Sequence, residues 1–124
     1  SNAEGLVSVV ETESGNVSSQ LSGFEWPYRI LIVEDRDLVV IPDMGRHVVR
    51  FVDYGDHTDI ETLPFPGEGP QGVALTPDHG TVFLSLSSSG EIAVIDLTTR
   101  RVVRRIDSGP SPDGIGWSPL VLRR

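Results

Sequence analysis

A short motif recurs in the chain at a spacing of about 42 residues. Residues 72–77 (GVALTP) align position for position with residues 114–119 (GIGWSP). Three pairs of apolar residues recur at a similar spacing, and each pair is followed by a carboxylate: Glu11, Asp53 and Asp96. A period of roughly 40 to 50 residues with several short β runs per copy is typical of β-propeller blades. The sequence therefore predicts an all-β propeller fold.

Two copies of the repeat are complete. The more regular copy, residues 70–111, has four runs of β-forming residues at 72–76, 81–86, 91–96 and 102–106, separated by polar, glycine- or proline-rich turns. The copy at residues 27–69 is less regular, with runs at 29–33, 38–41, 48–52 and 60–63. We expect each copy to form one blade of four antiparallel strands. No segment has the 3.6-residue period of a helix, so essentially no helix is predicted.

Both ends of the chain carry part of a further copy. Residues 4–26 match only the third and fourth strands of the repeat, with runs at 6–10 and 17–21. Residues 112–124 match the first strand at 115–118 and a shortened second strand at 120–122. Residues 1–3 (SNA) are typical of the remnant of a removed expression tag. The predicted organisation of residues 4–124 is a half blade, two whole blades and a half blade.

The repeat resembles the YVTN β-propeller repeat, which is related to NHL-like propeller repeats. In that family an opening, P-x-G-V-A-x-S-P-D-G, precedes a strand V-x-V-I-D. Residues 70–78 carry the opening, residues 94–96 carry the strand, and residues 112–119 repeat the opening. The middle copy departs from it, because residues 28–31 (YRIL) stand where residues 71–74 (QGVA) do later. The resemblance implies a propeller but little about function, since the family includes redox enzymes, surface proteins and exported proteins.

Sequence for about three blades does not by itself close a ring, because propellers have about 4 to 8 blades. One explanation is that the sequence is a piece of a longer propeller. The other is that two copies close one ring. The C-terminal first strand of one copy would then lie beside the N-terminal third and fourth strands of its partner, which gives six blades around a two-fold axis. We expect this homodimer.

Composition restricts the partners of the chain. A formal net charge of −8 argues against binding to nucleic acid or to an anionic membrane surface. No run approaches the roughly 18 apolar residues of a membrane-spanning helix.

Cysteine is absent, which excludes disulfides and thiolate metal sites. The compartment stays open, with an exported location slightly favoured. The arginines clustered between residues 100 and 105 are expected on a solvated outer strand.

Candidate ligand-binding residues follow from the predicted topology. In a propeller the first strand lines the central channel, and the loops that lead into it share one face with the loops joining second and third strands. This face is expected to carry Trp26, Tyr28, Arg46, His47, Glu68, Gln71 and Asp113. Tyr28, Gln71 and Asp113 hold equivalent places at the channel mouth. The competing interpretation is that these side chains only satisfy loop backbone groups and fill the rim of the pore.

Neither a metal site nor a set of catalytic residues is predicted. His57 and His79 map to turns at the end opposite His47, so no three-histidine site is assembled within one chain. The acidic residues near the channel mouth match no dedicated Ca²⁺ loop. No nucleophile elbow, phosphate loop or zinc-protease motif occurs, and no cofactor is expected. The recurring carboxylates Glu11, Asp53 and Asp96 are expected to accept hydrogen bonds from the turns that follow them.

The leading functional hypothesis is a non-catalytic binding or scaffold module that recognises a protein or a small ligand at the channel mouth. The alternative is a metal-dependent propeller enzyme of the lactonase or streptogramin-lyase type, which needs a divalent metal or a histidine acid–base set at that mouth. A third hypothesis is that the chain is a structural part of a larger cell-surface array. Trp26, in a loop before Pro27, is the better contact candidate, whereas Trp117 is expected in the core between blades.

Overall fold

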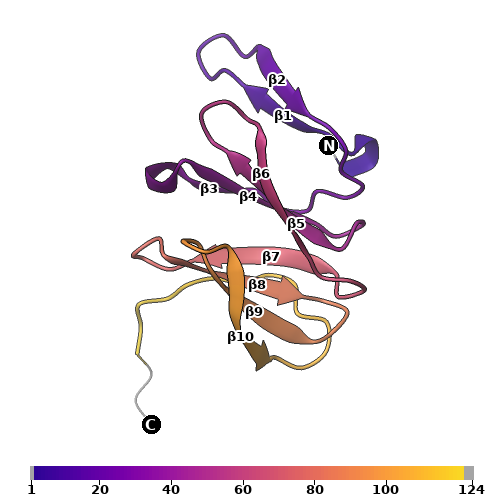
Figure 1. The fold of residues 1–124 in the computed structure, drawn as a ribbon, viewed down its shortest axis with the longest axis vertical. Coiled ribbons are helices and arrows are strands. Elements are labelled where there is room, and N and C mark those ends of the chain that lie inside the picture. Colours follow the sequence, from indigo (N-terminus) through magenta and orange to yellow (C-terminus); the bar gives the residue numbers. More distant parts are fainter. Residues whose placement is uncertain (1, 122–124) are drawn as a thin grey trace.

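The computed structural model of the chain describes residues 2–121 and consists of three antiparallel sheets stacked along the long axis (Figure 1). The first sheet is a hairpin of β1 (Val7–Val10) and β2 (Val17–Leu21). The second contains β3 (Leu31–Val33), β4 (Leu38–Asp43), β5 (Val48–Asp53) and β6 (Asp59–Pro64). The third contains β7 (Pro70–Leu75), β8 (Thr81–Leu86), β9 (Glu91–Asp96) and β10 (Arg101–Asp107). The all-β prediction is confirmed.

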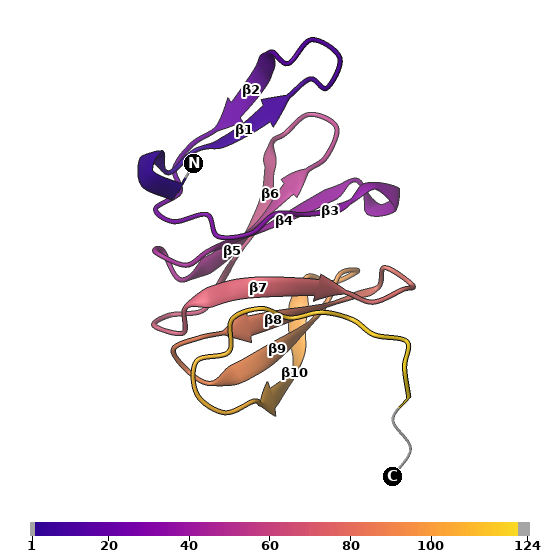
Figure 2. The ribbon, with the colours of Figure 1, turned by 180° about the vertical axis from the view of Figure 1, so that it is seen from behind.

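Each four-stranded sheet is a simple meander in which neighbouring strands follow one another in the sequence. The expected blades of four antiparallel strands are therefore present twice. The helical content of residues 2–121 is limited to two short 3₁₀ turns, η1 (Asn2–Glu4) and η2 (Glu34–Arg36). Seen from behind, the β1–β2 hairpin and the C-terminal segment lie at opposite ends of the stack (Figure 2).

The strand expected at residues 115–118 is not formed, and this prediction was wrong for the single chain. Residues 108–121 contain no strand, and the part of the predicted second strand at residue 122 lies outside the described residues. The segment instead crosses the face of the third sheet. The hydroxyl of Ser85 donates to the carbonyl of Asp113 (2.6 Å), and the Trp117 ring lies 6.4 Å from that of Phe83. A first strand needs the backbone groups of a second strand beside it, and residues 2–121 provide none there.

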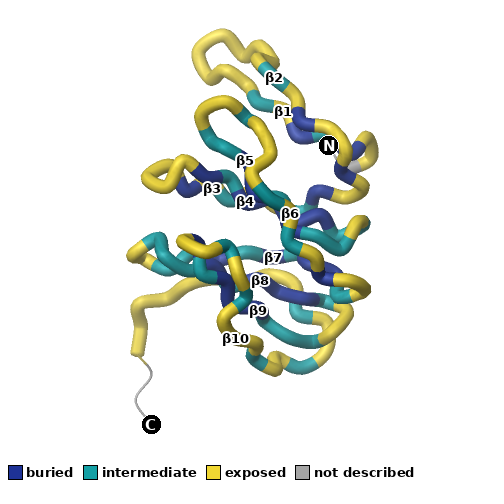
Figure 3. Tube along the Cα trace, viewed as in Figure 1, coloured by how far each residue is buried: buried dark blue, intermediate teal, exposed yellow. Residues whose placement is uncertain are grey.

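The main core lies between the two four-stranded sheets (Figure 3). Successive residues of a strand point to opposite faces, so the cross-strand pair Val40 and Phe51 faces the third sheet, whereas the adjacent pair Val39 and Val52 faces the hairpin. The third sheet contributes mainly residues of β8 and β9. The fully buried side chains of this core include Val40, Val49, Phe51, Phe65, Val82, Leu84, Leu86, Ala93 and Ile95. Burial of each large side chain stabilises the fold by about 1.5–3 kcal/mol.

A smaller core attaches the hairpin to the second sheet. Val7 and Leu21, which pair across the hairpin, pack with Phe24, Ile41 and Val52. The opposite face of the hairpin is more polar, with the Gln20 amide donating to the Ser8 hydroxyl (3.3 Å). The hairpin is therefore held on one side only.

The recurring carboxylates have the structural role that was expected. Asp53 accepts hydrogen bonds from the backbone N–H groups of Gly55 (2.8 Å) and Asp56 (2.9 Å). Asp96 accepts from two N–H groups of its own turn, at 2.8 and 3.1 Å. Glu11 accepts from the Ser14 hydroxyl. Such bonds satisfy the donors of a tight turn after each third strand, which explains why a carboxylate recurs there.

Candidate ligand-binding face

One end of the stack gathers the loops that lead into β3 and β7 and the turns between β4 and β5 and between β8 and β9. We call this region (residues 22–30, 43–47, 65–71, 87–90 and 108–113) the mouth end. Backbone hydrogen bonds connect its segments: Met44 N–H donates to the Trp26 carbonyl (3.0 Å), and Ser87 N–H donates to the Gly69 carbonyl (3.0 Å). The arrangement expected from propeller topology, with these loops at one end, is present within the chain.

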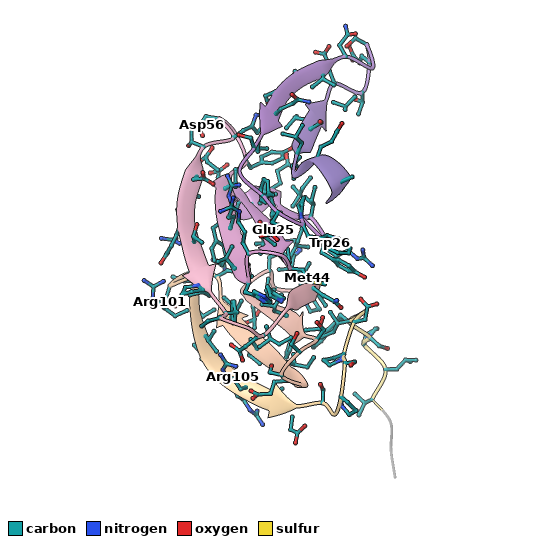
Figure 4. All side chains as sticks on the ribbon, turned by 90° about the vertical axis from the view of Figure 1, so that its right-hand side faces the viewer. Glu25, Trp26, Met44, Asp56, Arg101 and Arg105 are labelled. Carbon is teal, nitrogen blue, oxygen red and sulfur yellow. The ribbon has the colours of Figure 1, made fainter. Side chains whose placement is uncertain are left out.

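Asp43 fixes the loop that carries Trp26. Its side chain is fully buried, and its carboxylate accepts hydrogen bonds from the backbone N–H groups of Glu25 (2.9 Å) and Trp26 (2.8 Å). A third N–H, that of Arg46, is 3.3 Å away. Figure 4 shows Glu25, Trp26 and Met44 near one another at this end. Both oxygens of Asp43 therefore hold loop backbone, which is a positioning role.

The three residues predicted to be equivalent at the channel mouth make different contacts. The Tyr28 hydroxyl donates to Asp113 Oδ1 (3.3 Å), which connects the loop before β3 with the segment after β10. The Gln71 amide donates to the sulfur of Met44 (2.9 Å). Tyr28 and Asp113 are thus brought together, whereas Gln71 contacts the β4–β5 turn. The guanidinium of Arg29 lies 4.5 Å from the centre of the Tyr28 ring, within cation–π range.

Trp26 is the most exposed aromatic residue of this group, at 45%. Its loop is anchored by Asp43 and by a bridge between Pro27 and Asp43, so the ring is presented from a fixed backbone. Met44 lies at the same edge of the molecule (Figure 4). An exposed indole and a methionine at the same edge form a surface that suits an apolar or aromatic group.

His47 and Arg46 occupy the β4–β5 turn. The backbone of His47 is left-handed (φ 55°), and its Nδ1 accepts a hydrogen bond from Gly69 N–H (3.2 Å). The side chain of Arg46 is 55% exposed, with Nε 4.0 Å from Asp43. His47 therefore ties two mouth-end loops together, while Arg46 presents a cation to solvent.

Glu68 makes an ion pair across two blades. Its carboxylate accepts two hydrogen bonds from the guanidinium of Arg105, one of them 3.0 Å long, and its side chain is 18% exposed. The hydrogen bond with Arg105 lowers the pKa of Glu68 below its usual range. Glu68 thus remains an anion whose charge is balanced within the chain.

The other two histidines lie in turns at the opposite end, with left-handed backbones. His57 Nδ1 is 2.9 Å from the Ser19 hydroxyl. His79 Nδ1 is 2.8 Å from Asp35, and this hydrogen bond lowers the pKa of Asp35. Among residues 2–121, no group of three or more His, Cys, Asp or Glu side chains is placed to hold a metal ion.

The sequence did not reveal the pairing of the late arginines. Arg100 and Arg101 both donate to Glu61 on β6, and Arg105 donates to Glu68 just before β7. These contacts lower the pKa of Glu61. One signal in the sequence could have predicted these ion pairs between blades. Acidic residues at the end of one repeat are followed, about one repeat later, by arginines on the next outer strand.

No family model matches the sequence, and no curated protein is significantly similar to it. Solved structures of similar fold include the following two. Hydrazine synthase of Kuenenia stuttgartiensis superposes with a TM-score of 0.69 and 26% identity, covering 75% of this chain and 26% of that chain. Dihydro-heme d1 dehydrogenase NirN, in complex with DHE, superposes with a TM-score of 0.72 and 13% identity, covering 89% of this chain and 24% of that chain.

Both similar structures are β-propeller proteins, which agrees with a propeller fold for this chain. The chain spans about a quarter of the length of each. The resemblance to the YVTN repeat stays a prediction because no family model matches. Within the described part of the chain, no helix has the length and hydropathy of a membrane span.

Proposed function

We propose that this chain is a non-catalytic β-propeller module that binds a protein or a small ligand at its mouth end. The observation that carries the proposal is the hydrogen bond between Tyr28 and Asp113 at the end of the molecule where the ring of Trp26 is exposed. This contact joins segments that are two repeats apart in the sequence and places the Tyr28 ring next to a carboxylate. The ligand that fits is one with a flat apolar or aromatic group and a neighbouring donor, because Asp113 is an acceptor.

The proposed role is binding because the buried or shielded polar groups of this end are already used in holding it together. Asp43 binds loop backbone, His47 binds Gly69 N–H, and Glu68 binds Arg105. The exposed side chains of this end include Trp26 and Arg46. The enzymatic alternative, which needs a divalent metal at the same end, is tested by adding Ca²⁺, Mg²⁺ or Zn²⁺ during thermal unfolding: a saturable rise in Tm favours it.

We also propose that two copies complete one ring of six blades. The two sheets β3–β6 and β7–β10 each have the four antiparallel strands of a whole blade, and the β1–β2 hairpin matches a third and fourth strand by its position in the sequence repeat. Each copy then provides two whole blades, the outer half of one joint blade and, from its C-terminal segment, the inner half of the other. Closure by a second copy covers the sheet edges that the single chain exposes.

Ligand binding at the mouth end is tested by tryptophan fluorescence. In a Trp117→Phe background Trp26 is the only indole, so its emission reports on this face alone. We expect members of a defined panel of aromatic compounds that do not emit in the tryptophan band, with benzylamine and benzyl alcohol as the first probes, to change the emission saturably. Asp113→Asn is expected to weaken binding of the amine more than binding of the neutral alcohol. The proposal is contradicted if neither the panel nor candidate protein partners change the emission of Trp26 saturably.

A further inference from the structure

An apolar hollow lies between the β1–β2 hairpin and the inner strands of the second sheet. Its volume is about 250 Å³, and its lining includes Val9, Leu21, Ile30, Ile32, Val39 and Ile41. Ile30 is 52% exposed and Ile32 is 56% exposed. Two isoleucines, one on the innermost strand β3 and one directly before it, are both about half exposed to solvent, which indicates that this surface lacks a covering element.

The third sheet shows what covers the equivalent surface. There, Val73 and Leu75 of the innermost strand pack against the core shared with the preceding sheet. In β3 the residue that faces the following sheet is Leu31, so alternation turns Ile30 and Ile32 toward the hairpin. The hairpin has only the two outer strands of a blade. The inner strands that would cover Ile30 and Ile32 are missing from this position in the described chain.

The edge of β1 is open in the same place. In both complete sheets the third strand pairs on two sides: β5 lies between β4 and β6, and β9 lies between β8 and β10. In the described part of the chain β1 pairs only with β2. An open edge beside an apolar hollow is a site for an added strand, whose backbone pairs with β1 while its side chains fill the hollow.

The C-terminal segment has the matching sequence. Residues 114–119 repeat the first-strand motif of residues 72–77. Leu120 and Val121, which follow it, are 79% and 85% exposed. The hairpin and this segment lie at opposite ends of the molecule (Figures 1 and 2). The segment of one copy therefore reaches the hairpin of another copy and not its own.

We propose that residues 114–121 of a second copy dock at this site, with residues 120–121 along the free edge of β1, residues 114–119 as the innermost strand beyond them, and Leu120 and Val121 placed over Ile30 and Ile32. The proposal rests on the two-copy ring of the proposed function and names the contact that closes it. Two-fold symmetry gives two identical docking sites, one for each C-terminal segment. Each joint blade then has its inner strands from one copy and its outer strands from the other.

Cysteine cross-linking tests the contact directly, because the chain has no cysteine of its own. Ile32→Cys protein is mixed with Leu120→Cys protein and oxidised mildly. The expected product is a disulfide-linked heterodimer, since docking brings the two side chains within bonding reach. The matched control mixes Leu120→Cys with Val103→Cys, whose side chain is 62% exposed on the outer strand β10. Cross-linking no faster than in this control overturns the proposal.

A second measurement uses the dissociation constant of the dimer. Leu120→Asp is expected to raise it roughly 100-fold to 10,000-fold, because the dimer loses one buried leucine at each of its two contacts and each loss weakens binding by about 10-fold to 100-fold. Val103→Asp is expected to change it by less than about twofold. Because Leu120 is exposed within its own chain, the circular dichroism spectrum of either variant should match that of the parent protein.

The outcomes separate this contact from the wider proposal. A dimer that survives Leu120→Asp without change and does not cross-link overturns the docking mode but leaves a six-bladed ring formed through another contact. A protein that is monomeric at every concentration overturns both the docking mode and the ring. Neither result bears on ligand binding at Trp26, which is measured independently.

Discussion

The guanidinium of Arg105 on β10 holds the carboxylate of Glu68 with two hydrogen bonds, across 37 residues of sequence. Glu68 lies in the loop before β7, at the mouth end, whereas Arg105 lies on the outermost strand of the next blade. The same guanidinium also reaches Glu91, 3.5 Å away on β9. The ion pair therefore fixes the loop that leads into β7 to the outer strand of the sheet that follows.

This pair predicts a loss of stability in acid. Arg105 lowers the folded-state pKa of Glu68, so the unfolded chain binds a proton at a higher pH than the folded chain. The stabilisation is complete above the usual glutamate pKa of about 4.3 and is lost as pH falls through the lower folded-state pKa. Denaturant titrations at pH 7 and in steps below pH 5 measure the free energy of unfolding. This free energy should decline less with falling pH for Glu68→Gln than for the parent protein. Equal declines would show that the Glu68–Arg105 pair contributes nothing to stability.

Removal of the Asp43 carboxylate should loosen the mouth end. Asp43→Ala removes the acceptor of the partly buried hydrogen bonds from the backbone N–H groups of residues 25 and 26, and such a loss costs roughly 1–3 kcal/mol. Asp43→Asn keeps one acceptor oxygen and should lower the free energy of unfolding by less. Chemical denaturation measures the change in the free energy of unfolding. The emission of Trp26 in the Trp117→Phe background reports on the conformation of the loop. Equal stability of the alanine variant and the parent protein would contradict the assigned positioning role.

The core between the two four-stranded sheets should dominate stability. Phe51 is fully buried in it, so Phe51→Ala is expected to lower the free energy of unfolding by about 3–5 kcal/mol. Val103→Ala, on the exposed outer strand, should change it by less than about 0.5 kcal/mol. Chemical denaturation followed by circular dichroism measures both. Comparable effects of the two substitutions would mean that the sheets do not pack as described.

Much of the fold is readable from local pattern. β8 and β9 begin and end where alternation and turn residues predicted, at residues 81–86 and 91–96. Asp53 and Asp96 cap their turns as their periodicity suggested. These features depend on contacts within one repeat, and each repeat carries its own signals for them.

Features that depend on a neighbouring blade were harder to predict. The C-terminal first strand did not form, because strand geometry requires a paired neighbour that the described chain does not place there. Trp117 contacts Phe83 as part of the face between blades, yet it is 52% exposed because nothing covers its other side. The ion pairs of Arg100 and Arg105 with residues of the preceding repeat likewise depend on how two blades pack. Strand periodicity within one repeat does not encode that packing.

Self-association is the property on which the ring depends, and light scattering coupled to size-exclusion chromatography measures it without any variant. A concentration series of the unmodified chain should give a species of twice the 13.5 kDa chain mass, which persists on dilution to low micromolar concentration. A species that stays at 13.5 kDa over the whole series would contradict closure of the propeller by two copies.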